Sequence, residues 1–240
     1  MAEVAKHRPR WRRAALGGLI LLVFGPVLAV GVLWPVTPRV DNAEQLVRAN
    51  LGTHHAAELV APVGSYRVAQ ALIATEDRRF FHTPGIDPVS VVRVGFSALT
   101  GRGDTGGATL EQQLVKNLYF PQDDGVVTKV QEAELALKLD AHYSKNAVLR
   151  MYLADVYLGH GFYGLPAAAD GYFGVTPAQL TWSQASMLAG LVQAPSLYDP
   201  VRHLSAGRLR QRHVLDRLVA TGVLSAAQAG AAFAAPLGLR

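Results

Sequence analysis

One uncharged segment near the amino terminus restricts this chain more than any other feature. The 21 residues from Ala14 to Trp34 contain no charged side chain. A helix of that length, rising about 1.5 Å per residue, crosses roughly the 30 Å hydrocarbon core of a bilayer. A cleaved signal peptide is the alternative, but its apolar region is usually about 7–15 residues long. The sequence therefore favours a single uncleaved transmembrane helix, since no second apolar run of this length follows.

The charge distribution predicts the orientation of that helix. Residues 1–13 carry five basic side chains against Glu3 alone, although the whole chain has a net charge of only +5. Basic residues favour the cytoplasmic side of a span. We therefore expect a single-pass protein of the cytoplasmic (inner) membrane, with its amino terminus in the cytoplasm and the residues after the helix on the periplasmic side. The rest of the chain is nearly neutral, which argues against a nucleic-acid partner.

The sequence divides into five predicted parts. They are a basic tail (1–13), the anchor (14–34), a stalk or linker (35–59), the main domain (60–217) and a carboxy-terminal helical tail (218–240). The chain has no cysteine, which excludes zinc ribbons, iron–sulfur proteins, thiol enzymes and disulfide-stapled domains.

Helix-start signals dominate the main domain, and no stretch alternates apolar and polar residues long enough to predict a strand. Asp87-Pro88 is typical of a helix start, and Ser144 is expected to cap a helix over 145–158. Four Thr-x-x-Gln capping boxes begin at Thr109, Thr128, Thr176 and Thr181. The expected fold is therefore all-α.

Glu76 and Asp77 form the first candidate site, at the carboxyl end of a helix predicted over 68–79. The negative end of the helix dipole and the neighbouring Phe80 and Phe81 both favour a raised carboxyl pKa, which suits a group that accepts a proton. A solvated helix end is the alternative.

A glycine-rich loop over 101–107 leads into the second candidate site. Free N–H groups at the start of the following helix are suited to binding phosphate. Gln112 and Gln113 lie about one turn before Lys116, so their amides and the lysine ammonium can together hold a sugar and an anion. The alternative is that Gln112 only caps the helix and Lys116 is only a surface charge.

Glu132 is the third candidate, on the next predicted helix. It borders the apolar face, where an unpaired carboxylate is costly. Lys116 or Lys129 could supply the cation, and a purely structural salt bridge is equally compatible. The eight histidines have no metal-ligand spacing.

Five segments in order carry a family resemblance. They are ATEDRRFFHTPGID, GGATLEQQLVKN, KVQEAELALKLDAHYSKNAVLRMYLADVYLG, GFYGLPAAADGYFG and LTWSQASMLAGLVQAPSLYDP. Together they resemble the peptidoglycan glycosyltransferases of glycosyltransferase family 51, in particular the monofunctional biosynthetic transglycosylases. The resemblance implies a lysozyme-like all-α fold with an apolar jaw, formed by the helix over 87–99 with Arg93, that dips into the membrane. It also implies inverting polymerisation of lipid II into β-1,4 glycan chains with release of undecaprenyl pyrophosphate.

The resemblance assigns roles by position. Glu76 matches the general base on the acceptor 4-hydroxyl, and Glu132 is the second candidate catalytic residue, in the motif that binds the donor pyrophosphate. The positions expected to bind substrate are Asp77, Phe80, Thr109, Gln112, Gln113, Lys116, Asn117 and Lys129. No cofactor is required, although a divalent cation (Mg²⁺ or Mn²⁺) at the pyrophosphate is compatible with the family; its ligands are not identified.

The implied partners are lipid II, the growing glycan chain and the membrane, with divisome or elongasome proteins as further candidates. The sequence does not predict the oligomeric state. It contains no Ser-x-x-Lys or Lys-Thr-Gly motif, so we expect no transpeptidase domain.

Six positions depart from the family pattern: Thr83 (usually His), Ala108 (Ser), Glu111 (Thr), Thr128 (Arg), Ala154 (Asn) and Val175 (basic). A lost arginine at 128 and a gained glutamate at 111 should weaken pyrophosphate binding, so Thr128→Arg with Glu111→Thr is expected to raise turnover.

The alternative function is a weak or inactive paralogue that binds lipid II as a scaffold. Glycan cleavage by a lytic transglycosylase is less favoured, because it leaves no pyrophosphate for the block from Gln112 to Lys116 to hold.

Overall fold

Helices make up nearly all regular structure in this computed structural model, which describes residues 34–54, 59, 62–90, 107–123 and 125–240. Within those residues there is no strand, only an isolated antiparallel bridge between Tyr157 and Tyr163. The expectation of a mainly helical chain is confirmed for this part of the protein.

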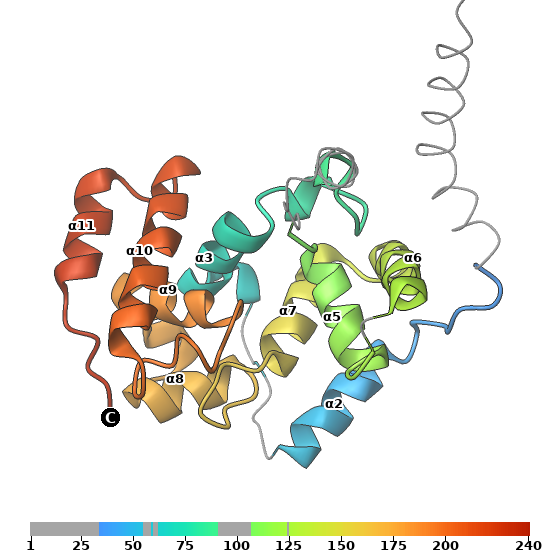
Figure 1. Cartoon of the computed structure of the whole chain (residues 1–240), viewed down its shortest axis with the longest axis horizontal. Helices are drawn as coiled ribbons and strands as arrows, with labels where there is room; N and C mark the ends of the chain where they lie inside the picture. Colours follow the sequence, from blue (N-terminus) through green and yellow to red (C-terminus); the bar gives the residue numbers. More distant parts are fainter. Residues whose placement is uncertain (1–33, 55–58, 60–61, 91–106, 124) are drawn as a thin grey trace, which may run out of the picture.

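The helices form two groups that lie side by side (Figure 1). One group packs α3, α9 and α10 together with α11 against α10, and the other packs α5, α6 and α7 together with α2 against α7. The α-helices are α2 (Ala43–Thr53), α3 (Arg67–Glu76), α5 (Leu110–Tyr119), α6 (Val126–His142), α7 (Lys145–Asp155), α8 (Leu165–Phe173), α9 (Trp182–Leu191), α10 (Leu204–Ala220) and α11 (Ala226–Ala234). In the same described residues, three 3-10 helices join them: η1 (Val63–Ser65), η2 (Phe80–His82) and η3 (Pro177–Gln179).

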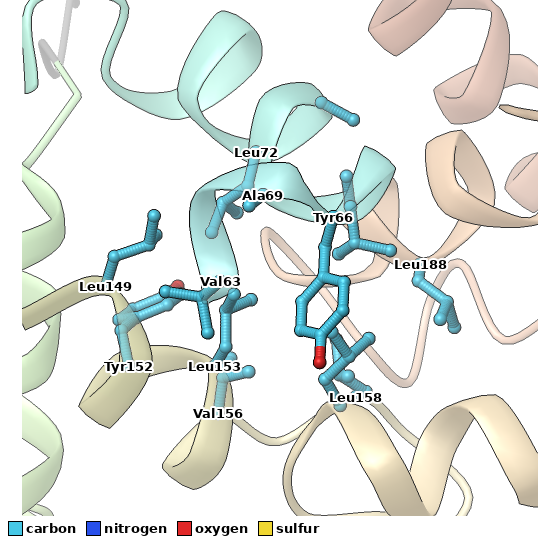
Figure 2. Packing of buried hydrophobic residues seen from close by; sticks show 14 of the residues in the cluster. Val63, Tyr66, Ala69, Leu72, Leu149, Tyr152, Leu153, Val156, Leu158 and Leu188 are labelled. Atoms are coloured by element: carbon cyan, nitrogen blue, oxygen red, sulfur yellow. The ribbon is translucent and has the colours of Figure 1, made fainter. Parts of the chain in front are cut away.

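The core runs between α3 and α7 and joins the two groups. Figure 2 shows side chains of η1 and α3, including Val63 and Leu72, facing Leu149 and Leu153 of α7. All four are buried. Burying an aliphatic side chain of this size contributes about 1.5–3 kcal/mol, so this contact fixes where the end of α3, and therefore Glu76, is held.

Most of the predicted helix starts are confirmed. Thr109, Thr176 and Thr181 form the expected capping boxes, and Ser144 accepts a hydrogen bond from the backbone N–H of Ala147 at 3.3 Å. Asp87 accepts from the N–H of Val89 at 3.1 Å, as a helix cap would.

The capping box predicted at Thr128 is wrong. Helix α6 begins earlier, with Gly125 at its N-cap position, and the N–H of Lys129 bonds the carbonyl of Gly125 at 3.0 Å. Glycine is tolerated at an N-cap, so the helix extends one turn further than the Thr-x-x-Gln signal suggested. Thr128 is buried inside that first turn.

The structure differs from the predicted stalk over 35–59. Helix α2 lies within it and buries Ala43, Val47 and Leu51, a stripe with the four-residue spacing of a helix face. Ahead of α2, Lys138 of α6 donates to the hydroxyl of Thr37 at 2.7 Å. This segment is part of the folded unit.

The predicted carboxy-terminal tail over 218–240 is also packed. Its helix α11 lies against α10, and Leu218, Leu224 and Leu237 are buried in the core. The expected anchor over 14–34, apart from Trp34, and the expected jaw helix beyond Ser90 lie outside the described residues. None of the helices in the described ranges is sufficiently long and apolar to cross a membrane.

Candidate active site

Glu76 opens onto a polar cleft of about 410 Å³. It is the last residue of α3, and the walls come from five separate stretches of chain. These are Thr75–Arg79 at the end of α3, the residues Asp87, Val89 and Ser90, the loop Gly107–Thr109 ahead of α5, Gln193 just after α9, and Arg210 and Arg217 on α10. The cleft therefore exists only where the two helix groups meet.

Among the described residues, Arg210 is the ion-pair partner of Glu76. Its Nη2 donates to Oε1 of Glu76 at 2.6 Å, and the two side chains are 12% and 16% exposed. Burial raises the pKa of Glu76, and the charge and hydrogen bond of Arg210 offset part of that rise. The group is thus placed to accept a proton at a higher pH than an exposed carboxylate would.

Sequence analysis missed Arg210. A signal was available, because Arg210 falls on the same face of α10 as the buried residues Gly207, Val214 and Leu218. A cation on a buried helix face needs an acceptor. The sequence could not say which acceptor, since the partner lies 134 residues away.

Asp77 and Thr109 hold the loops around the cleft. Asp77 Oδ2 accepts the N–H of Leu110 at 3.3 Å, which ties the end of α3 to the start of α5, and burial raises the pKa of Asp77. Thr109 donates from its hydroxyl to the carbonyl of Gly85 at 2.6 Å. Phe80 is fully buried, with Lys145 Nζ 4.8 Å from its ring centre.

The amides predicted to bind substrate are engaged within the protein. Gln112 accepts the N–H of Thr109 at 2.9 Å, and Gln113 accepts the hydroxyl of Tyr152 at 2.7 Å. Asn117 hydrogen-bonds Asp155, a buried carboxyl that also accepts from Asn50 at 2.7 Å. These contacts join α5 to α7 and α2.

Lys129 and Glu132 form the ion pair that the sequence left open, with Nζ 3.0 Å from Oε2. Glu132 is buried, while Lys129 is exposed. Among the described residues, the lining of the Glu76 cleft includes none of Gln112, Gln113, Lys116, Lys129 or Glu132. The cations that line it are Arg78, Arg79, Arg210 and Arg217.

The structure pairs Glu111, which the sequence placed near an anion site, with a lysine. Glu111 is fully buried, and its Oε1 lies 2.5 Å from Nζ of Lys145. The same ammonium bonds Asp140 at 2.6 Å and the carbonyl of Thr83 at 2.6 Å. Glu111 is one of the four buried residues of α5, with Leu110, Leu114 and Val115, and it is not among the residues that line the Glu76 cleft.

The structure adds nothing in favour of a resident metal. The described residues contain no group of three or more His, Cys, Asp or Glu side chains that could hold a metal ion.

Comparison with known proteins places the chain in a family. The transglycosylase family profile matches residues 50–219, a span that contains Glu76 and Arg210. The chain is 39% identical over 171 residues to penicillin-binding protein 1A of Aquifex aeolicus, covering 71% of this chain and 24% of that protein. It is 38% identical over 174 residues to penicillin-binding protein 1F of Bacillus subtilis, covering 72% of this chain and 24% of that protein.

A third relative has a more similar length. The chain is 35% identical over 181 residues to "Putative transglycosylase H16_A0665" of Cupriavidus necator, covering 75% of this chain and 78% of that protein. By contrast, the matched part spans about a quarter of the two penicillin-binding proteins.

Proposed function

This chain belongs to the transglycosylase family, and we propose that it polymerises lipid II into the β-1,4-linked glycan chains of peptidoglycan. The observation that carries the proposal is the pairing of one accessible, partly buried carboxylate with several cations in a single cleft. Transfer of a sugar from a pyrophosphate needs a base on the acceptor and positive charge at the leaving group.

Glu76 is the base in this proposal. It takes the proton from the 4-hydroxyl of the acceptor sugar as that oxygen attacks C1 of the donor sugar. The new O4–C1 bond forms on one face while the C1–O bond to pyrophosphate breaks on the other, so the configuration at C1 inverts. The electron pair of the broken bond leaves with undecaprenyl pyrophosphate.

The leaving group carries the largest negative charge in the reaction, and arginine side chains are suited to it. Guanidinium groups bind phosphate oxygens through paired, charge-assisted hydrogen bonds. Arg78 and Arg217 line the cleft beside Glu76 and are the side chains we assign to the pyrophosphate. A divalent cation, Mg²⁺ or Mn²⁺, remains compatible with this step, and assays with and without EDTA test it.

We place the reaction at the outer face of the cytoplasmic membrane, where the anchor over 14–34 holds the enzyme beside its lipid-linked substrate. The alternative function, an inactive paralogue that binds lipid II as a scaffold, is less favoured by the structure than by the sequence alone. One of its reasons was the extra negative charge of Glu111, and this carboxylate is paired with Lys145 and does not line the cleft.

The deciding experiment is polymerisation of fluorescent lipid II by the purified full-length protein in detergent. We expect glycan chains that a muramidase digests, and Glu76→Gln should lower the rate by about 10²–10⁴-fold. Glu44→Gln is the matched control, because Glu44 is a surface carboxylate paired with Arg150 at 2.7 Å.

Three other outcomes would contradict the proposed activity or the proposed role of Glu76. Lipid II binding without polymer in the wild-type protein would identify a scaffold. Clearing of purified cell-wall sacculi would identify a lytic enzyme. Residual activity of Glu76→Gln above a tenth of wild type would remove Glu76 from the role of base.

A further inference from the structure

The cleft holds Glu76 in a contact that opposes its proposed role. A base must offer a carboxylate oxygen to the acceptor hydroxyl at about 2.6–3.2 Å. In this structure Oε1 of Glu76 is already bound by Arg210 Nη2 at 2.6 Å. A carboxylate stabilised by an adjacent guanidinium is also a weaker base than the same carboxylate without it.

On the premise that Glu76 is the base of the proposed function, we infer that Arg210 is a positioning residue that covers Glu76 until a substrate pyrophosphate draws its guanidinium away. Binding of the anionic group would then release the base at the moment when it is needed. Before that, the ion pair would occupy Oε1 and keep Glu76 a weaker base, so the enzyme would activate water or a stray hydroxyl less readily.

The contacts of Arg210 allow such a movement. Within the part of the chain that the structure describes, the guanidinium of Arg210 makes one further hydrogen bond, from Nε to the carbonyl of Gly190 at 3.3 Å, near the long end of the normal range. A Cβ at position 190 would lie 3.0 Å from Cγ of Arg210, so the absence of a side chain on Gly190 leaves room for the arginine stem.

The neighbouring cations are bound differently. Arg79 pairs with Asp87, and Nε of Arg217 donates to the carbonyl of Ala74 at 3.3 Å. Among the arginines of the cleft, Arg210 is therefore the one for which the structure records an ion pair with the candidate base. A pyrophosphate carries more than one negative charge, so it competes effectively with a single carboxylate for this guanidinium.

The electrostatic consequence follows from the groups that face Glu76 or line the same cleft. These are Tyr152 of α7, Arg210 and Arg217 of α10, and Asp77, Arg78, Arg79 and Asp87 of the adjoining loop. Burial raises the pKa of Glu76 and Arg210 lowers it. Removing Arg210 from the carboxylate therefore raises the pKa further and makes Glu76 a stronger base.

The first test needs no turnover. The Glu76 carboxyl can be titrated by NMR in the full-length, ¹³C-glutamate-labelled protein, with its signal assigned by its loss in Glu76→Gln. Inorganic pyrophosphate, the probe, should raise the pKa of Glu76 in the wild type. In Arg210→Gln the pKa should already be raised, by about one unit, and pyrophosphate should change it little. Arg210→Lys, which keeps the charge, should respond in the direction of wild type.

An unchanged pKa of Glu76 at saturating pyrophosphate in the wild type would overturn the inference, and so would a failure of pyrophosphate to bind. Because this arm does not depend on polymerisation, it still decides the role of Arg210 if the proposed function proves wrong.

The second test uses the pH dependence of lipid II polymerisation. The profile of kcat/KM reports the free enzyme, and that of kcat reports the substrate complex. In Arg210→Gln the acid limb of the kcat/KM profile should move up by about one pH unit. The acid limb of the kcat profile should stay in place, because Arg210 has already left Glu76 in the wild-type substrate complex.

Equal movement of both limbs would show a fixed ion pair and overturn the inference. The matched control is Arg217→Gln, two turns along the same helix and in the same cleft. It should weaken substrate binding without moving either limb, and a shift of the kcat/KM limb as large as that of Arg210→Gln would also overturn the specific role of Arg210.

Discussion

Glu76 and Glu111 are both carboxylates on helices, each bound by one cation, and burial raises the pKa of both. They differ in what surrounds the pair. Glu76 is 16% exposed and lines the cleft, and its partner Arg210 lies on α10, a second helix of the same group. Glu111 has no exposed surface, and its partner Lys145 also bonds Asp140 and the carbonyl of Thr83.

The difference shows that burial and a raised pKa do not by themselves mark a catalytic group. Lys145 is held by three acceptors and joins α5, α6 and the loop before Pro84, so its pair with Glu111 is a structural contact. Arg210 is held mainly by the carboxylate itself, beside open space. A group available for chemistry needs access, together with a partner that can be exchanged.

The largest effect is expected when the two ion pairs are compared by the variants Glu111→Ala and Glu76→Gln. Removing Glu111 takes one partner from a buried ion pair and should lower the free energy of unfolding by about 3–4 kcal/mol. The folded fraction should keep a polymerisation rate near wild type. Denaturant unfolding and specific activity measured on the same samples check this.

Glu76→Gln should show the reverse, with lost activity and a change in unfolding free energy below about 1 kcal/mol, because Glu76 is partly solvated. If Glu111→Ala instead inactivates the enzyme without destabilising it, the contrast between the two pairs fails.

A second test moves a cation into a buried position. Thr128 is 3% exposed within the first turn of α6, so the rise in turnover expected from sequence for Thr128→Arg is no longer expected. An arginine there should instead disturb packing and lower stability by about 1–3 kcal/mol. Thr128→Ser, similar in size and polarity, is the control. A faster, fully stable Thr128→Arg protein would show that position 128 does reach the substrate.

The smallest expected effect is a pH dependence of stability. Because the pKa of Glu111 is raised in the folded protein, the folded state binds more protons than the unfolded state above pH 4.5. This stabilisation is present at low pH and is lost as pH rises through the raised pKa. Glu111→Gln removes that contribution.

The difference in unfolding free energy between wild type and Glu111→Gln should therefore change as pH rises from 4.5, in favour of wild type at the acid end. A difference that stays constant, or that favours wild type at neutral pH, would contradict this assignment. Unfolding curves at several pH values supply the measurement.

Short-range features of this protein could be read from its sequence. The caps at Thr109 and Ser144 and the pair of Lys129 with Glu132 involve residues three positions apart. Such contacts depend only on the helix repeat, which brings positions three and four apart onto one face. The helical content of the chain and the position of Glu76 at a helix end follow from the same local rules.

Tertiary structure decided the environment of each charge. The inward orientation of Glu111 and the burial of α2 depend on which helix faces meet, and the partner of Glu76 depends on the packing of α3 against α10. Local propensity carries no information about a contact between residues 134 positions apart. The sequence alone thus supplied the candidate base, whereas only the packed helices show which cation covers it.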